Sequence, residues 1–189
     1  MSTARSEDAD GPVRAPSRQS AAAARRRARE QQILAETRRL FDESGVRDAQ
    51  IDDIARAVGI NRAIIYRHFS GKEELFALAV ESYLEELRGR LEAAAAKQPN
   101  DPVKRLRAVV AAFVDYGLEY PAFIDCAQTL MRRPGPELLE QVSEGALLRL
   151  GRAITTCLRT LTQTLDDGVK SGDFKKGDTV LMANYMYAT

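Results

Sequence analysis

The sequence predicts an all-α fold in two parts, an N-terminal helix-turn-helix unit of three helices and a larger C-terminal helical domain. Apolar residues recur at spacings of three and four from Ile33 nearly to the end of the chain. The second half shows none of the apolar–polar alternation that is typical of half-buried strands. Glycine and proline divide the pattern into separate helices, most clearly at Gly59 and at Pro99.

Composition excludes several classes of protein. The 189 residues suffice for one or two domains, and 28 basic residues nearly balance 27 acidic ones, so the total charge does not indicate nucleic acid. No apolar run approaches the roughly 18 residues of a membrane span, and the N-terminus lacks the apolar core of a signal peptide. We therefore expect a cytoplasmic protein without a membrane partner. Cys126 and Cys157 are expected to be buried thiols, with no disulfide and no metal.

The N-terminal region divides into two segments. Residues 1–20 offer little apolar surface and predict a disordered leader. The run from Ala21 to Gln32 favours helix and carries four arginines. It is either a basic arm that meets DNA beside a binding domain or a solubilising tail. Between Arg25 and Lys72, eleven basic residues stand against seven acidic ones, a modest local excess of positive charge.

The segment 51–69 has the residue types of a helix, a tight turn and a second helix. Gly59 is placed to take the left-handed conformation that ends a helix, and Asn61 is a good N-cap for the next one. Ile65 and Phe69 face back to the first helix. The apolar face of that first helix is formed by Ile51, Ile54, Ala55 and Val58.

The outward face of the second helix carries groups that suit phosphates and base edges. Its residues are Arg62, Ala63, Tyr66 and Arg67, with Ile64 and His68 near the borders. Spacing alone fits equally well an ordinary helical hairpin with a solvated basic face. Next, Ser70 and Glu73 form the S-x-x-E pattern that predicts a capping box. The helix dipole disfavours Lys72 in that first turn, whereas a nearby phosphate explains it.

The run GVRDAQIDDIARAVGINRAIIYRHFSGKEELF resembles the DNA-binding domain of TetR-type transcriptional regulators, over roughly residues 33–76. The resemblance implies a helix-turn-helix DNA-binding domain with a basic arm at 21–76 and a helical ligand-binding and dimerisation domain at 77–189. It also implies that Arg62, Ala63 and Arg67 read the major groove. The Tyr66 hydroxyl and the Lys72 ammonium are then expected to bind phosphates.

Three positions depart from the family pattern, and the first is Thr37, which stands where alanine is usual. Gln50 stands where a capping threonine or serine is usual; it can donate to a phosphate but caps poorly, so Asp48 or Asp52 is expected to help. Ile64 stands where a small hydroxyl residue is common, and it either contacts a thymine methyl group or thickens the helix–helix contact. The only histidine is expected to pack near the backbone rather than to bind a metal. The predicted DNA-binding residues are Gln50, Asn61, Arg62, Ala63, Ile64, Tyr66, Arg67, His68 and Lys72.

The run from Lys72 to Lys97 is predicted as one helix that links the two parts and can carry a tilt between them. Beyond it we find no Gly-rich phosphate loop, no nucleophile–base arrangement and no paired carboxylates, so we expect neither an enzyme nor a cofactor. The aromatic and sulfur side chains there either form core or line a pocket. The resemblance favours a small, apolar effector, and the pocket candidates are Phe113, Tyr116, Phe123, Cys126 and Met131.

The resemblance further implies a homodimer, formed through residues 146–165 and the tail from Thr179. Such a dimer reads a palindromic double-stranded DNA operator with half-sites one helical turn, roughly 34–36 Å, or a multiple of it apart. The chain stops at Thr189 inside an apolar run, so we expect the natural protein to continue. The resulting prediction is a repressor that a ligand releases from its operator. The alternative is a non-specific or architectural helical module for DNA or protein.

Overall fold

The computed structural model describes residues 18–188, which form nine α-helices and no strand, so the all-α prediction is confirmed. In chain order the helices are α1 (Arg18–Ser44), α2 (Ile51–Val58), α3 (Arg62–Tyr66), α4 (Lys72–Ala96), α5 (Pro102–Glu119), α6 (Pro121–Met131), α7 (Gly135–Gln141), α8 (Glu144–Ser171) and α9 (Thr179–Ala188). Within this range no helix is long and apolar enough to cross a membrane.

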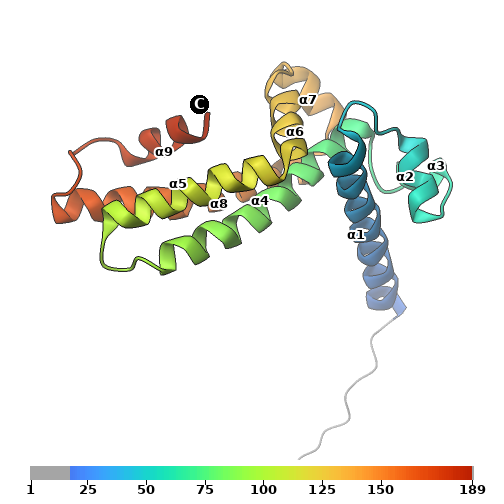
Figure 1. Cartoon of the computed structure of the whole chain (residues 1–189). Coiled ribbons are helices and arrows are strands. Elements are labelled where there is room, and N and C mark those ends of the chain that lie inside the picture. Colours follow the sequence, from blue (N-terminus) through green and yellow to red (C-terminus); the bar gives the residue numbers. More distant parts are fainter. Residues whose placement is uncertain (1–17, 189) are drawn as a thin grey trace, which may run out of the picture.

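The second half of α1 packs with α2 and α3 into a small unit at one end of the molecule (Figure 1). Ile33 and Phe41 of α1, Ile54 of α2 and Ile65 of α3 are each at most 1% exposed. Burying a side chain of this size stabilises the fold by roughly 1.5–3 kcal/mol. Thr37 is fully buried in the same core, where its hydroxyl donates to the carbonyl oxygen of Ile33 at 2.8 Å. The buried hydroxyl of Thr37 is therefore hydrogen-bonded within the protein.

The helix α4 is shared by both parts of the molecule. Near its start, the ring of Phe76 meets the ring of Phe41 edge to face, with centroids 5.2 Å apart. Farther along, Leu87 and Leu91 are fully buried where α4 packs on α5 and α8. Figure 1 shows these three long helices running side by side, away from the three-helix unit. The predicted linking helix is thus confirmed as one continuous element.

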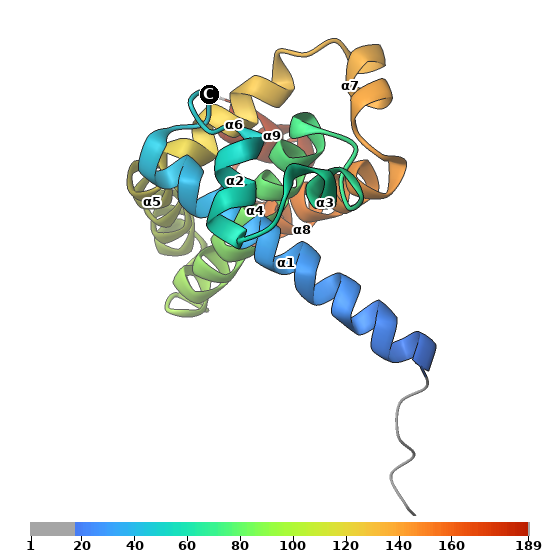
Figure 2. The ribbon, with the colours of Figure 1, turned by 90° about the vertical axis from the view of Figure 1, so that its right-hand side faces the viewer.

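The remaining helices occupy opposite ends of the C-terminal domain. The helix α6 contacts both α1 and α4, and α7 contacts α4, next to the three-helix unit. The helix α9 folds back along α8 (Figure 1). Figure 2 shows the N-terminal half of α1 projecting from the body of the molecule.

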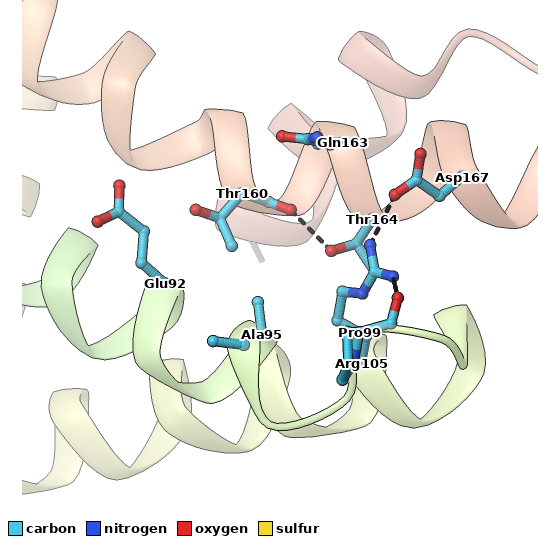
Figure 3. Close-up of a pocket in the computed structure, with 9 residues that line it drawn as sticks. Glu92, Ala95, Pro99, Arg105, Thr160, Gln163, Thr164 and Asp167 are labelled. Atoms are coloured by element: carbon cyan, nitrogen blue, oxygen red, sulfur yellow. Dashed lines mark hydrogen bonds and ion pairs between the residues drawn. The ribbon is translucent and has the colours of Figure 1, made fainter.

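An open cavity of about 410 Å³ lies at the far end of the C-terminal domain, between the end of α4, the start of α5 and α8 (Figure 3). Arg105 reaches across it to Asp167, with Nη1 and Oδ2 2.6 Å apart. Thr160 and Thr164 face the same space from α8. Its lining is mixed polar and apolar, and it lies at the opposite end of the molecule from α3 (Figure 1).

Two predicted boundaries are wrong. Residues 18–20 belong to α1 rather than to the leader, because the alanine-rich run that follows favours one continuous helix; residues 1–17 lie outside the described part of the chain. The glycine-containing segment from Gly168 to Gly177 is predicted from its sequence as a turn region, but α8 continues to Ser171. Gly168 lies against the ring of Phe174, where a Cβ atom would come within 2.0 Å of the ring, so this glycine is a packing residue.

The predicted capping box at the start of α4 is also wrong. Gly71 occupies the N-cap position, and the N–H of Ser70 donates to the carboxylate of Glu74 rather than to that of Glu73. Glu73 is instead paired with Arg133, with Oε1 and Nη2 3.0 Å apart. Glu73 therefore forms a long-range ion pair and not the local capping hydrogen bond that the sequence pattern predicts.

Candidate DNA-binding surface

The turn between α2 and α3 has the geometry that the sequence predicts. Gly59 adopts a φ of 72°, in the left-handed region that glycine enters without strain. The N–H of Ile60 donates to the carbonyl oxygen of Ala55 at 2.9 Å and closes the end of α2. The side-chain oxygen of Asn61 accepts the N–H of Ile64 at 3.1 Å and caps α3. Local hydrogen bonds therefore fix the start of the second helix.

The helix α3 buries one side and exposes the other. Ile65 is 1% exposed and faces the core, and Ile64 is half-buried at the border. Two guanidinium groups and a phenol on one solvent-facing surface are suited to contact base edges and phosphates in a major groove. The exposed residues of α3 and its C-cap are the four expected to face outward, Arg62, Ala63, Tyr66 and Arg67.

Arg62 is held only weakly by the protein. Its Nη1 lies 3.7 Å from Oδ2 of Asp52, and both side chains are 61% exposed. Its guanidinium carbon lies 5.7 Å from the centroid of the Tyr66 ring. An exposed ion pair of this kind contributes about 0–1 kcal/mol. A phosphate or a guanine edge can therefore replace Asp52 at little cost in free energy.

Gln50 is the exposed N-cap residue of α2. Of the two aspartates expected to support this helix start, Asp52 lies in the first turn, where its negative charge interacts favourably with the helix dipole. The hydrogen bond to the cap comes from another residue, because Oδ2 of Asp53 accepts the N–H of Gln50 at 3.3 Å. Asp53 is the third residue of the helix, and a side chain there reaches back to the N-cap.

Two further predicted residues lie just after α3. The side chain of His68 is 14% exposed, and its Nδ1 lies 3.3 Å from Oε1 of Glu30 in α1. Lys72 is half-buried, with Nζ 5.3 Å from the centroid of the Phe76 ring. Burial on its own raises the pKa of Glu30, but hydrogen bonds from Arg26 and His68 outweigh it and hold that pKa below its usual value. The turn after α3 is therefore tied electrostatically to α1.

Hydrogen bonds also tie the start of α4 to the connection between α6 and α8. The N–H of Ser70 and the hydroxyl of Ser143 both donate to the carboxylate of Glu74, which is 6% exposed. The hydroxyl of Ser70 donates to the carbonyl oxygen of Gln141 at 2.8 Å. Together with the ion pair between Arg133 and Glu73, these contacts form what we call the α4 latch.

The α4 latch was not predicted from the sequence. Its signal is the acid at position 74, which directly precedes the buried run from Leu75 to Val80. Burial on its own raises the pKa of Glu74, but hydrogen bonds from Ser143 and Ser70 outweigh it, so the pKa lies below the usual carboxyl value. Glu74 therefore stays charged near neutral pH and holds both serines.

A second polar group, the Arg38 cluster, joins α1 to α4 and α5. Arg38 donates to the carboxylate of Glu86, and its guanidinium carbon lies 4.1 Å from the centroid of the Tyr83 ring. The hydroxyl of Tyr83 donates to Oδ1 of Asp42 at 2.5 Å, and that of Tyr116 donates to the carbonyl oxygen of Tyr83 at 3.0 Å. Burial and the bond to Asp42 raise the pKa of Tyr83. The cluster connects the three-helix unit to the C-terminal domain.

The five residues predicted to line an effector pocket do not all come together. Tyr116, Phe123 and Cys126 are buried, and the rings of the first two lie 5.7 Å apart between centroids. Burial raises the pKa of the Cys126 thiol to about 12. Phe113 is half-buried, whereas Met131 is 73% exposed at the end of α6. The cavity in Figure 3 is lined by other residues.

Comparisons with known proteins agree with this geometry. The family model described as "Bacterial regulatory proteins, tetR family" matches residues 33–79. The transcriptional activator FasR of Mycolicibacterium smegmatis is 32% identical over 85 residues, which are 45% of this chain and 38% of that protein. The transcriptional regulator AcrR of Shigella flexneri is 38% identical over 81 residues, 42% of this chain and 37% of that protein. These matches thus span about two fifths of each curated relative.

Solved structures resemble a larger part of the chain. The TetR family regulator PfmR of Thermus thermophilus is 26% identical, with a TM-score of 0.61 over 83% of this chain and 80% of that one. The regulator FadR of Bacillus subtilis, solved in complex with stearoyl-CoA, is 19% identical, with a TM-score of 0.62 over 84% of this chain and 81% of that one. At that identity the second likeness concerns the fold alone.

Proposed function

We propose that this chain, whose residues 33–79 match the tetR family model, is a TetR-type regulator that binds a palindromic DNA operator as a homodimer. In the simplest form it is a cytoplasmic repressor, without enzymatic activity, that a small apolar ligand releases from the operator. The named relatives include one activator, so the sign of regulation is part of the proposal. We place the domain boundary between residues 76 and 77, inside α4.

The observation that carries this proposal is the solvent-facing surface of α3. Arg62 and Arg67 are proposed to reach guanine edges, where each bidentate contact discriminates against a wrong base by about 1–3 kcal/mol. The small side chain of Ala63 lets the helix approach the bases closely. Ile64, at the border, either contacts a thymine methyl group or only packs on α2. Asn61 holds the start of α3 toward the groove.

Phosphate contacts are proposed for the residues around α3. Gln50 lies at the start of α2, and Lys72 lies at the start of α4, so the two flank α3 in sequence. Their polar ends, with the exposed hydroxyl of Tyr66, are suited to phosphate oxygens on either side of a groove. His68 is proposed to support this arrangement through its contact with Glu30.

The homodimer is supported by apolar side chains that the single chain leaves uncovered. Exposed contiguous apolar surface is typical of protein–protein interfaces, and a two-fold dimer doubles the contacts of one short recognition helix. The large apolar residues exposed on α8 and α9 include Leu148, Ile154, Val180, Leu181, Met182 and Met186. We propose that these two helices pair with their copies.

The effector is proposed to bind the C-terminal domain near Tyr116, Phe123 and Cys126. These residues adjoin the Arg38 cluster, because the hydroxyl of Tyr116 donates to the backbone of Tyr83. A ligand that separates α5 or α6 from α4 would therefore disturb a contact that also holds α1. Ligand binding shifts the equilibrium between two shapes only as far as its affinities for them differ.

Selection of random duplex DNA by the purified chain, at two salt concentrations, tests the proposal. Recovery of one palindromic sequence is the expected result. Recovery of no sequence, with binding that collapses as the salt concentration rises, would mean that only phosphate contacts form. That result would favour the alternative of a non-specific architectural module.

A further inference from the structure

The N-terminal half of α1, residues 18–32, is a helix without a protein core to support it. All buried residues of α1 belong to its second half, namely Ile33, Thr37 and Phe41. No residue between 18 and 32 is buried. Figure 2 shows this half leaving the body of the molecule as a straight continuation of the packed half. Packing therefore explains where α1 is anchored but not why it is extended.

The extension is strongly basic. It carries five arginines against one acid, Glu30. A face that serves only solubility usually mixes both signs of charge. Arg25 and Arg27 make no ion pair within the described part of the chain. We call residues 18–32 with these five arginines the arginine arm.

Two features of the sequence favour a continuous helix through the arginine arm. Alanine fills positions 21–24 and 28, and alanine has the highest helix propensity. The helix also needs no separate nucleation, since it continues the anchored half of α1. Fifteen helical residues extend about 22 Å at 1.5 Å each. Duplex DNA presents one phosphate charge per roughly 1.7 Å of axis, so the arm is long enough to meet several phosphates.

The arm leaves the domain next to the proposed DNA-binding surface. Oε1 of Glu30 accepts a hydrogen bond from Nε of Arg26 at 2.9 Å and lies 3.3 Å from Nδ1 of His68. His68 directly follows Arg67 and precedes Lys72 by four positions. The base of the arm is thus continuous with the residues proposed to contact DNA, and the charge along the arm has the same sign.

We propose that the arginine arm binds the phosphate backbone of duplex DNA outside the half-site that α3 reads. The proposal rests on the proposed function, because it takes α3 to lie in the major groove. It extends that function, since a single protomer then contacts more DNA than its recognition helix spans. The contact carries no sequence information of its own and acts by adding phosphate contacts to specific binding.

The test compares the full chain with two triple variants on two duplexes. The arm variant is Arg25→Gln, Arg27→Gln and Arg29→Gln, because glutamine keeps helix propensity and Arg26 stays to hold Glu30. The control is Arg107→Gln, Lys175→Gln and Lys176→Gln, which removes three exposed charges from the C-terminal domain. One duplex holds only the selected operator, and the other adds about ten base pairs on each side, roughly one helical turn.

On the long duplex, the arm variant is expected to bind about 10–100-fold more weakly than the parent and to lower the slope of log affinity against log salt by about 2 to 3. On the short duplex, the arm variant and the parent are expected to bind equally. The control should match the parent on both. Equal affinities and slopes for all three proteins on the long duplex would overturn the proposal.

The two proposals fail in different ways. If the parent selects a sequence but the arm variant binds like the parent, the arginine arm fails and the proposed function stands. If the parent selects no sequence, the proposed function fails. The arm proposal is then tested by the slopes of log affinity against log salt on a long random duplex. Equal slopes for the parent and the arm variant would reject the arm proposal. Helical content by circular dichroism verifies that each variant is folded.

Discussion

Two tyrosines differ in what surrounds their hydroxyl groups. Tyr83 is fully buried and donates to Asp42, whereas Tyr66 is 46% exposed and makes no hydrogen bond within residues 18–188. Tyr83→Phe removes one buried hydrogen bond and is expected to lower the free energy of unfolding by about 1 kcal/mol. Tyr66→Phe should change it by less than about 0.5 kcal/mol but weaken DNA binding. Urea unfolding and titration of the selected operator measure both effects.

Glu74 predicts a specific dependence of stability on pH. Its pKa lies below the usual carboxyl value in the folded chain, so its stabilising effect is present above the unfolded pKa and is lost as the pH falls through the folded pKa. The parent should therefore lose more free energy of unfolding between pH 7 and about pH 3 than the Glu74→Gln variant. Urea unfolding at several pH values measures the difference. Glu137→Gln, at an exposed acid of α7, is the control and should follow the parent.

The sequence predicts a contact between two residues only when the two lie close together along the chain. The roles of Gly59 and Asn61 follow from their neighbours alone, and both are confirmed. Glu74 could not be paired from the sequence, because Ser143 is 69 positions away. Glu73 fits a local capping box in the sequence for the same reason, because its actual partner, Arg133, is 60 positions away.

At the level of elements, the α4 latch predicts coupling between the start of α4 and the connection from α6 to α8. Arg133→Glu replaces the ion pair with Glu73 by a repulsion between two acids. We expect faster amide hydrogen exchange in residues 132–143 and weaker operator binding, because the support of the turn after α3 is loosened. Adding Glu73→Arg in the same chain should restore both, since the pair is re-formed with its charges exchanged.

The neighbouring Arg132 is the control for this exchange. It is exposed and bonded within its own helix turn, to Gln128 at 3.5 Å. Arg132→Glu should leave hydrogen exchange and operator binding close to those of the parent. A double variant that stays as weak as Arg133→Glu alone would show that the ion pair does not support the start of α4.

Most helices could be predicted from apolar spacing and from proline. The starts of α5 and α6 follow from the sequence, because Pro102 and Pro121 stand in their first turns. The end of α8 could not be predicted, because a glycine at position 168 suggests a turn in the sequence. Only the structure shows that Gly168 makes room for the ring of Phe174. Whether residues 18–20 belong to the helix or to the leader likewise depends on how far an anchored helix continues.

At the level of the whole molecule, the exposed apolar side chains of α9 predict a dimer. Leu181 is 55% exposed on this helix. Leu181→Glu should convert the dimer to a monomer at micromolar concentration, because two charges would be buried at a two-fold interface. Leu118→Glu, at a residue that is 76% exposed on α5, is the control and should remain dimeric. Sedimentation velocity measures the state, and equal behaviour of the two variants would contradict the proposed interface.

The two polar clusters suggest how the parts of the molecule communicate. The Arg38 cluster holds α1 to α4 and α5, and the α4 latch holds the start of α4 to the α6–α8 connection. Both act on the unit that carries α3, so a ligand that favours another packing of α5 or α6 would move it. The resemblance locates the effector only in the C-terminal half, because that half carries no specific motif.

The central claim is that the exposed face of α3 reads DNA sequence, and it is tested most directly by repeating the selection of random duplex DNA with Arg62→Ala. We expect the recovered palindrome to lose its preference at one position in each half-site and to keep it elsewhere. Arg107→Ala, on the exposed surface of α5, should recover the same sequence as the parent. A palindrome that is unchanged by Arg62→Ala and by Arg67→Ala would contradict the claim.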